Sequence, residues 1–307
     1  MANQDFDVII VGAGPAGLTS GIYAARSGLE TLILEKEATG GNMSDAPGID
    51  NYPAVEEVTG MELAEKMEEH ASKYVDIREI EPVEKIETGD TMRIETSENE
   101  YKSDAIILAT GTEYRKLGVP GEKEFSGSGV SYCATCDGFF YKDKHVLVVG
   151  GGNAAVADAS HLLDIGCDVT LVHRRDELRA EKALQESFFD KGGEIIWNSV
   201  LEEIKGEDSV ESVKLRNVEE DSESELEVDG VFVSIGEVPK TDIAKSIGVE
   251  LNDSGYIGTD DDQRTNIERV YAAGDVTGDP KQVIIACAEG AKAAITAYKE
   301  LKNPYWV

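Results

Sequence analysis

Short apolar runs and longer helix-forming stretches alternate in the first part of the chain. An apolar run covers Phe6 to Val11, a glycine cluster follows it, and an alanine-rich stretch extends from about Gly14 to Ser27. A second apolar run, Thr31 to Leu34, comes directly afterwards. This order predicts a strand, a helix and a second strand, because strands are short and apolar while good helix formers fill longer stretches. The segment is therefore expected to form a βαβ unit.

The same order recurs near the middle of the chain. His145 to Val149 predicts a strand, Gly150 to Gly152 a turn, Asn153 to Ile165 a helix, and Asp168 to Val172 a second strand. The chain has 307 residues, which is enough for two domains with their own cores. Two βαβ units predict an α/β fold with two Rossmann-like, three-layer dinucleotide-binding domains.

Two later apolar runs end in residues typical of strand ends that meet a ligand. They are Ala105 to Ala109, followed by Thr110 and Gly111, and Arg269 to Ala273, followed by Gly274 and Asp275. The acid-rich segment from Glu202 to Val228 is expected to form exposed hairpins, with a solvated loop at Glu219 to Glu225. A last helix is expected from about Gln282 to Leu301.

The first glycine turn has the spacing of a dinucleotide-binding motif, G-x-G-x-x-G. It reads Gly12-Ala13-Gly14-Pro15-Ala16-Gly17. The first glycine permits the tight turn, the second lets the backbone approach a pyrophosphate, and the third allows close packing of helix and strand. Glu35, at the end of the second strand, can accept a hydrogen bond from a ribose hydroxyl and would repel a 2′-phosphate.

The second glycine turn has the related form G-x-G-x-x-A but lacks the following acid. It reads Gly150-Gly151-Gly152-Asn153-Ala154-Ala155. The strand after its helix ends instead in His173-Arg174-Arg175, with Arg179 close behind. Guanidinium groups bind phosphate oxygens through charge-assisted forked hydrogen bonds, so this cluster favours NADPH over NADH. The alternative is a surface helix whose arginines pair with Asp176, Glu177 and Glu181.

Two different dinucleotides best explain one ribose-type and one phosphate-type site, and a nicotinamide and a flavin together would form a hydride relay. Cys133 and Cys136 are the expected next electron acceptor, since two thiols at this spacing can exchange with a disulfide. Asp137 follows at once and could move the proton that a leaving thiolate needs. The alternative is half of a zinc site, but Cys167, Cys287 and the four histidines show no ligand spacing. No metal is expected, and both single cysteines are expected to be buried.

Acidic residues are spread along the whole chain, 61 against 29 basic ones, for a formal net charge of −32. This balance argues against a nucleic-acid or anionic-membrane partner. No apolar run approaches the roughly 20 residues that cross a bilayer, and no export signal is visible, so a cytoplasmic location is expected. Surface self-repulsion of this size needs screening, which predicts a halophilic protein from a salt-rich cytosol, the alternative being an ordinary acidic enzyme.

In this order, the motifs resemble those of low-molecular-weight, NADPH-dependent thioredoxin reductases of the bacterial and archaeal type. The resemblance covers essentially the whole chain, and its most specific part is the cysteine pair with Asp137. The other matching motifs are the turn at Gly12 to Gly17, Ala109-Thr110-Gly111, the turn at Gly150 to Ala155, His173-Arg174-Arg175 with Arg179, and Gly274-Asp275.

The resemblance implies a homodimer. Each subunit would have a discontinuous FAD domain, residues 1–116 and 245–307, with an NADPH domain inserted at residues 117–244. It implies an NADPH:thioredoxin-disulfide oxidoreductase that passes a hydride from NADPH to FAD, then electrons to the cysteine pair, then to thioredoxin or a thioredoxin-like protein. It also implies that the inserted domain rotates between two poses through linkers near Leu117 and Ala244.

The resemblance further implies individual roles. Cys136 would be the flavin-proximal sulfur, Cys133 the sulfur that attacks thioredoxin, and Asp137 the acid that protonates a leaving thiolate. Asp275 matches an aspartate at the flavin ribityl chain, and Gln282 matches a glutamine near the isoalloxazine ring. The expected FAD residues are Gly12, Gly14, Pro15, Ala16, Gly17, Glu35, Asn42, Thr110, Gly111, Gly274, Asp275, Lys281 and Gln282. The expected NADPH residues are Gly150, Gly152, Asn153, Ala154, Ala155, His173, Arg174, Arg175 and Arg179.

Three positions depart from the family pattern. Asn42 stands where many relatives have a glutamine that contacts the flavin, Lys281 replaces a common arginine, and Ala154 stands where threonine or serine is frequent. The resemblance therefore leaves the contribution of these three side chains to flavin potential or donor affinity open.

The residues also leave other functions open. A flavin dithiol oxidase that uses oxygen, or a thioredoxin reductase fed by ferredoxin, would keep the fold, but neither needs the arginine cluster. An NADPH:ferredoxin oxidoreductase of the same fold would have no use for the cysteine pair. An alternative of another class is a dinucleotide-binding regulator whose thiols sense oxidants without turnover.

Overall fold

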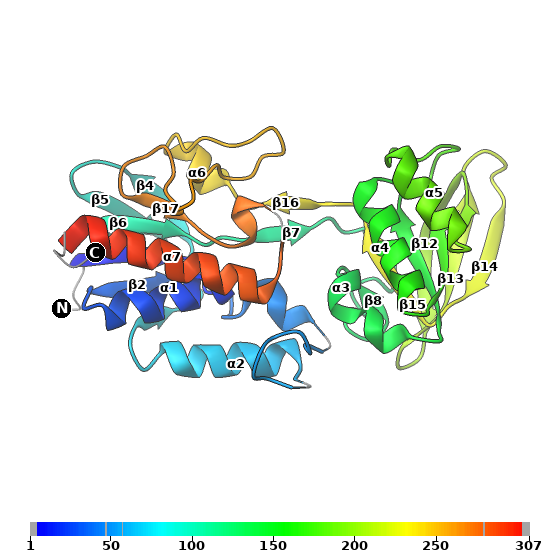
Figure 1. The fold of residues 1–307 in the computed structure, drawn as a ribbon, viewed down its shortest axis with the longest axis horizontal. Coiled ribbons are helices and arrows are strands. Elements are labelled where there is room, and N and C mark those ends of the chain that lie inside the picture. The colour runs from blue at the N-terminus through cyan, green and yellow to red at the C-terminus, as the bar shows by residue number, and fades with distance from the viewer. Residues whose placement is uncertain (1–4, 47, 57, 279, 303–307) are drawn as a thin grey trace. The chain divides into compact units, whose positions relative to one another are not determined.

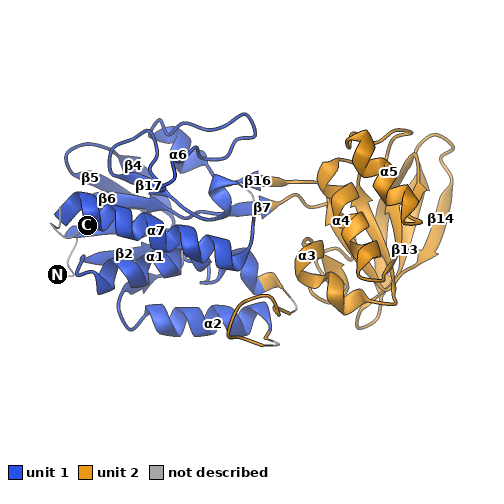
Figure 2. Ribbon diagram, viewed as in Figure 1, with its two compact units in different colours: residues 1–44, 59–113, 238–307 blue, residues 45–58, 114–237 orange. Residues whose placement is uncertain are grey.

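The computed structural model describes residues 5–46, 48–56, 58–278 and 280–302, which form two compact units (Figures 1 and 2). Unit 1 comprises residues 1–44, 59–113 and 238–307, and unit 2 comprises residues 45–58 and 114–237. The continuous part of unit 2 begins and ends slightly earlier than the insert expected from the sequence, residues 117–244. No helix in the described part of the chain has the length and apolar character needed to span a bilayer.

Unit 1 is built on a seven-stranded sheet. Its parallel strands, in spatial order, are β3 (Asp76–Arg78), β2 (Thr31–Leu34), β1 (Asp5–Val11) and β6 (Glu100–Leu108), with β17 (Val270–Ala272) alongside the end of β6. Two antiparallel strands, β5 (Met92–Thr96) and β4 (Val83–Glu87), extend the sheet from the other end of β6. Both strands of the first predicted βαβ unit are therefore confirmed.

Both faces of this sheet are buried. Successive side chains of β1 point to opposite sides of the sheet, and each set packs in its own core. Val8 and Ile10 pack beneath α1 (Pro15–Arg26) and α7 (Val283–Lys302), which lie against each other. Ile9 and Val11 pack on the other side, in a core that includes residues of β4, β5 and α6 (Asp242–Ser246). The remaining elements of the unit are α2 (Gly60–Ala71) and the 3-10 turns η1 (Gly41–Asp45) and η3 (Asp275–Thr277).

The strand register of unit 1 gathers the expected ligand-binding ends at one edge. Val11 at the end of β1 pairs with Leu108 of β6, and Ala272 of β17 pairs with the same Leu108. Because the three strands are parallel, the Gly12 turn and the segments that follow β6 and β17 all leave the sheet at its carboxyl edge. Ligands of open α/β sheets bind at this edge.

Unit 2 has a five-stranded parallel sheet that is covered on both faces. Its strands, in spatial order, are β11 (Glu194–Ile196), β10 (Asp168–Val172), β9 (His145–Gly150), β15 (Gly230–Ser234) and β8 (Val130–Ser131). One face packs against residues of α3 (Ala134–Asp137), α4 (Asn153–Asp164), α5 (Lys182–Asp190) and η2 (Gly138–Tyr141). The other face packs against the antiparallel sheet of β12 (Ser199–Gly206), β13 (Val210–Asn217) and β14 (Glu223–Glu227). The second predicted βαβ unit, and with it the α/β fold class, is confirmed.

The acid-rich hairpins of unit 2 differ from the expectation at one end. The solvated loop was expected at Glu219 to Glu225, but Glu223 to Glu225 belong to β14 and pair with β13. Acidic composition is a poor guide here, because the side chains of an edge strand face solvent while its backbone still pairs. The structure also contains two short strands that the sequence did not predict, β7 (Thr112–Tyr114) and β16 (Glu237–Pro239). They pair with each other where the chain passes between the units.

Candidate active site

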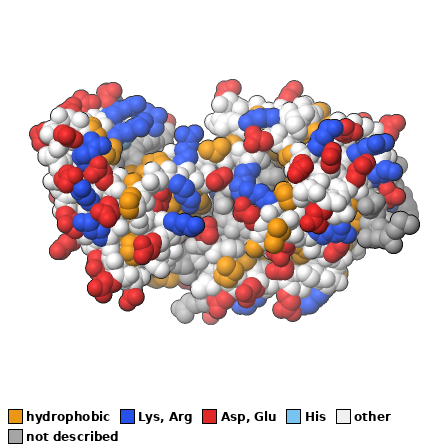
Figure 3. Space-filling model, turned by 180° about the vertical axis from the view of Figure 1, so that it is seen from behind, with side chains coloured by type: hydrophobic (Ala, Val, Ile, Leu, Met, Phe, Trp, Pro, Cys, Tyr) orange, Lys and Arg blue, Asp and Glu red, His pale blue; other side chains and the backbone are white. Residues whose placement is uncertain are grey.

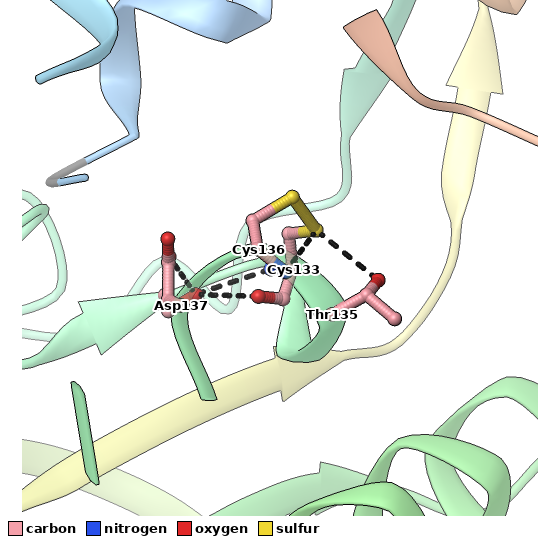
Figure 4. The surroundings of a disulfide bond; sticks show 5 residues. Cys133, Thr135, Cys136 and Asp137 are labelled. Carbon is pink, nitrogen blue, oxygen red and sulfur yellow. Dashed lines mark hydrogen bonds between the residues drawn. A yellow bond between two sulfur atoms is a disulfide. The ribbon is translucent and has the colours of Figure 1, made fainter. Parts of the chain in front are cut away.

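The two cysteines of the motif form a disulfide in unit 2. The Cα atoms of Cys133 and Cys136 lie 5.3 Å apart, and both side chains are half-buried. Cys133 directly precedes α3, and its Sγ accepts the backbone N–H of Cys136 at 3.2 Å (Figure 4). The Thr135 hydroxyl lies 3.6 Å from the same sulfur. The predicted pairing is confirmed, and the donors around Cys133 suit a sulfur that carries negative charge after reduction.

Asp137 lies next to the disulfide and is buried, with 4% of its surface exposed. The Ser131 hydroxyl donates to Asp137 Oδ2, while Oδ1 is buried and has no hydrogen-bond partner among the described residues. Burial raises the pKa of this carboxyl to about 6, although the bond from Ser131 acts in the opposite direction. The group can therefore hold a proton close to neutral pH. Ser131 carries no sequence signal, and its role becomes visible only in the fold.

Cys167 and Cys287 are buried, as predicted, and neither forms a disulfide within the described part of the chain. Cys167 donates weakly to the Gly138 carbonyl, and burial raises the pKa of its thiol to about 11. A thiol in this state is unreactive. Among the described residues, no group of three or more His, Cys, Asp or Glu side chains could hold a metal ion.

The first glycine turn fits a pyrophosphate. A Cβ at Gly12 would lie 2.3 Å from the Ala109 carbonyl oxygen, and one at Gly17 would lie 1.8 Å from that of Gly12, so both glycines serve packing. Gly14 faces open space, with its nearest neighbour at 4.0 Å. The helix α1 that starts here has no side-chain cap and no acid in its first turn, whereas α2 is closed by a capping box of Thr59 and Glu62. The N–H groups of α1 are thus left for an anion.

Glu35 lies beside this turn, as the sequence predicted. Its carboxylate accepts the backbone N–H of Ala13 at 2.6 Å and of Glu37 at 3.0 Å, and each oxygen retains a further lone pair for a ribose hydroxyl. The backbone of Glu35 is fixed by bonds to Arg78 and Glu81. Buried Glu81 in turn accepts hydrogen bonds from the side chains of Thr96, Asn99 and Tyr101. Sequence reasoning missed this supporting network because its members are far apart in the chain.

The remaining expected FAD residues lie in loops that follow the sheet strands of unit 1. The Asn42 amide donates to the backbone carbonyl of Thr112 at 3.2 Å, and to its hydroxyl, so this departure from the family glutamine has an internal bond. The N–H of Gly274 donates to Glu289 at 2.7 Å, ahead of η3, which begins at Asp275. The Thr110 hydroxyl donates to the Lys240 carbonyl, and the Lys281 ammonium lies over the Tyr256 ring.

The second glycine turn has the same arrangement. A Cβ at Gly150 would lie 2.4 Å from both the Ala155 Cβ and the Ser234 carbonyl oxygen, whereas Gly152 has nothing within 4 Å of such an atom. The helix α4 also lacks a side-chain cap and a first-turn acid. This turn therefore fits a pyrophosphate by the same reasoning as the first.

The arginine cluster follows β10, whose last residue, Val172, pairs with Val149 beside the second turn. Arg174, Arg175 and Arg179 are exposed, and within the described parts of the chain their side chains make no ion pair or hydrogen bond. Glu181, one of the acids that could have paired with them, bonds to Asn153 instead. Unpaired guanidinium groups in so acidic a chain fit a phosphate better than the salt-bridged surface helix.

His173 differs from the arginines that follow it. Its ring is buried under the turn, since a Cβ at Gly151 would lie 2.2 Å from it, and Nε2 has no partner within the described structure. Burial lowers the pKa of His173, and the neighbouring arginines act in the same direction. A neutral, buried ring supports the turn from beneath; it does not add positive charge to the phosphate site.

A disulfide beside a proton-holding carboxyl, in a chain with two nucleotide-type turns, is the arrangement of a flavin- and pyridine-nucleotide-dependent disulfide reductase. The family model described as pyridine nucleotide-disulphide oxidoreductase matches residues 6–290. The chain belongs to this family, within its low-molecular-weight thioredoxin reductase branch.

Named relatives cover nearly the whole chain. It is 42% identical to a protein named thioredoxin reductase from Listeria innocua, over 99% of this chain and 97% of that one. A protein of the same name from Bacillus subtilis is also 42% identical, over 94% and 92%. The crystal structure of thioredoxin reductase from Streptococcus pyogenes shares 42% identity with a TM-score of 0.93, covering 99% of this chain and 100% of that one.

Proposed function

We propose that this protein is an NADPH-dependent disulfide reductase that binds FAD in unit 1, binds NADPH in unit 2 and reduces thioredoxin. The observation that carries the proposal is the Cys133–Cys136 disulfide beside the buried, protonatable Asp137. Relatives that match nearly the whole chain also carry the name thioredoxin reductase. The two glycine turns support a relay that ends at this disulfide.

The assignment of FAD to unit 1 rests on the shape and charge of its turn. The open face of Gly14, the uncapped start of α1 and the Glu35 carboxylate suit a pyrophosphate and an unphosphorylated ribose. NADPH suits unit 2, where an equivalent turn lies beside Arg174 and Arg175, and no acid takes the place of Glu35. The domain assignment is thus residues 1–116 and 245–307 for FAD and residues 117–244 for NADPH.

Bound FAD would supply two-electron transfer between the nicotinamide and the disulfide. Two electrons break the Sγ–Sγ bond and leave two thiolates, and the overall reaction takes up two protons, which end on the two sulfurs of the reduced partner. Asp137 holds one of these protons next to Cys136, and the Cys136 N–H stabilises negative charge on Cys133. The Cys133 thiolate then attacks the partner disulfide, and Cys136 resolves the mixed disulfide, which releases a reduced partner and regenerates the starting pair.

An apolar surface beside the disulfide suits a protein partner. Phe139 is 70% exposed and Phe140 is 46% exposed, directly after the redox motif. Exposed aromatic side chains are typical anchors of protein interfaces.

We further propose, from the family resemblance, that the protein acts as a homodimer in the cytoplasm. A salt-rich cell interior is proposed from the excess of acidic residues in the sequence; on the face that Figure 3 shows, acidic and basic side chains lie interspersed.

Cys136→Ser tests the order of electron transfer. The variant is expected to keep flavin reduction by NADPH, because the nucleotide sites are untouched, and to lose turnover of thioredoxin. Anaerobic bleaching of the flavin absorbance measures the first step, and steady-state disulfide reduction measures the second. The buried thiol variant Cys167→Ser is the control that should keep both. Retained thioredoxin turnover in Cys136→Ser would refute the assigned pathway.

The double variant Arg174→Ala, Arg175→Ala tests the phosphate site. Because guanidinium–phosphate contacts are charge-assisted, the KM for NADPH is expected to rise about 10- to 100-fold while that for NADH changes little. Arg115→Ala removes an exposed arginine elsewhere in unit 2 and is the matched control. Equal effects on both coenzymes would exclude recognition of the 2′-phosphate by these arginines.

A further inference from the structure

Two side chains connect the arginine segment of unit 2 to its glycine turn. The backbone N–H of Glu181 donates to Asn153 Oδ1 at 2.8 Å, and Asn153 Nδ2 donates to Glu181 Oε1 at 3.3 Å. Asn153 is the first residue of α4, and Glu181 is the residue before α5. We call this reciprocal pair the Asn153–Glu181 clamp.

The clamp is one of several anchors on the segment between β10 and α5. The Arg179 N–H donates to the Gly151 carbonyl at 2.8 Å, so the backbone of the segment is bonded to the turn itself. Leu178 and Ala180 are buried in the core of unit 2. The arginine side chains remain exposed, while the backbone that carries them is held against the start of α4.

Neither helix capping nor charge explains the position of Glu181. Its side chain does not cap α5, the helix that it precedes. It places a carboxylate beside the first turn of α4, where negative charge would repel a bound pyrophosphate. Because the Glu181 carboxylate is electrostatically unfavourable for the ligand, its presence here requires another explanation. The two hydrogen bonds that Glu181 makes with Asn153 provide one.

We propose that the Asn153–Glu181 clamp fixes the spacing between the pyrophosphate turn and the 2′-phosphate arginines, and thereby raises the preference for NADPH over NADH. This inference rests on the proposed NADPH site in unit 2. Groups held in their binding geometry before the ligand arrives lose less conformational entropy on binding. Glu181 is thus a positioning residue that acts through the backbone of the arginine segment.

The test compares Glu181→Ala with Glu181→Gln in the full-length protein. Both variants remove the negative charge, but glutamine keeps an Oε1 acceptor for Asn153, so the difference between them isolates the hydrogen bond. Binding of 2′,5′-ADP and of ADP is measured by titration calorimetry. Glu181→Ala is expected to bind 2′,5′-ADP about 3- to 10-fold more weakly than Glu181→Gln, the size of one exposed hydrogen bond, with ADP binding similar in both. Glu186→Ala, an exposed acid on α5, is the matched control.

Steady-state kinetics supply a second readout. The KM for NADPH is expected to be higher in Glu181→Ala than in Glu181→Gln, with the same kcat in both, and Glu181→Gln is expected to keep the wild-type ratio of KM values for the two coenzymes. Identical behaviour of the alanine and glutamine variants, or equally weakened binding of 2′,5′-ADP and ADP, would overturn the proposed role of the clamp. Neither result would contradict the proposed NADPH site. A wild-type protein that binds 2′,5′-ADP no better than ADP would instead overturn the proposed site, and the clamp with it.

Discussion

Asp137 shows how burial raises the pKa of a carboxyl group until it can hold a proton near neutral pH. A solvated aspartate is ionised at neutral pH, but this side chain has one bond from Ser131 and one oxygen without a partner within the described residues. Its pKa of about 6 lies close to the pH at which a thiol–disulfide enzyme works. The sequence marks Asp137 only by its place after Cys136, and the fold supplies the burial that gives this position its chemistry.

The same burial gives a prediction for stability. The pKa of Asp137 is raised above that of an unfolded aspartate, so the native state binds the proton more tightly, and the stabilisation present below about pH 4 is lost as the pH rises through about 6. Asp137→Asn has no such loss. The oxidised variant is expected to be more stable than wild type at pH 8 by roughly 3 kcal/mol, and the difference should vanish near pH 4.

Denaturant unfolding at several pH values measures this difference. Asp143→Asn, which removes an exposed carboxyl at a positive φ that asparagine tolerates, is the control and should change little. A constant offset between Asp137→Asn and wild type over the whole pH range would show that the carboxyl does not titrate as described.

At the scale of elements, local patterns identified the strands and helices that carry the nucleotide turns. The bounds of β2 and β10 agree with the sequence prediction, and the α1 and α4 helices agree to within a residue or two at each end. These elements are predictable because a βαβ unit is local and its core strands are apolar throughout. Glu35 and the arginine cluster could be identified for the same reason, since each follows a strand of such a unit.

The elements that were missed depend on partners far away in sequence. β7 and β16 pair across more than a hundred residues, and β14 is defined by pairing with β13 and not by its acidic side chains. The capping box of Thr59 and Glu62 at the start of α2 was a local signal that could have been used. The hydrogen bond of the Asn42 side chain to Thr112 and the burial of His173 could be recognised only in the folded structure.

Two glycines of the first turn have different roles, since Gly17 is needed for packing and Gly14 for ligand binding. Gly17→Ala is expected to destabilise the apoprotein by roughly 3 kcal/mol or more, because its Cβ would overlap the Gly12 carbonyl oxygen. Gly14→Ala is expected to change stability by less than about 1 kcal/mol, since Gly14 has a φ of −75° and open space around it. Its methyl group would nevertheless block the approach of a pyrophosphate.

Denaturant unfolding of the apoproteins and the flavin content of the purified variants check this pair. Gly14→Ala should be folded and colourless, and Gly17→Ala should unfold at a clearly lower denaturant concentration than wild type. A stable Gly17→Ala protein that retains flavin would contradict the close packing of α1 against the turn.

At the scale of the whole molecule, the acidic surface determines the response to salt. A net charge of −32 is a formal sum over 61 acidic and 29 basic residues, and many of the basic ones are already engaged in exposed ion pairs. Isolated surface pairs of this kind contribute little. Screening of the unpaired carboxylates is therefore the larger electrostatic contribution to stability.

The melting temperature is expected to rise by several degrees between dilute buffer and 1 M KCl, where the Debye length falls to ~3 Å. Thermal unfolding followed by circular dichroism at increasing KCl measures the effect. Sucrose, which favours compact states without screening charge, is the control and should not reproduce the steep part of the curve. A melting temperature that is independent of KCl would remove the case for adaptation to salt.

The last helix has a consequence for how the molecule is made on the ribosome. Gly290 of α7 packs so closely on α1 that a Cβ there would lie 2.1 Å from the Ala16 carbonyl oxygen, and Ser20 of α1 donates to the Gly290 carbonyl at 3.0 Å. Helix α1 therefore acquires this packing partner only after α7 has been synthesised, and the whole of residues 114–237 emerges between the two helices. Domains fold as units during translation, so the nascent chain can complete the continuous part of unit 2 first. The packing of α1 in unit 1 is completed only after α7 has been synthesised.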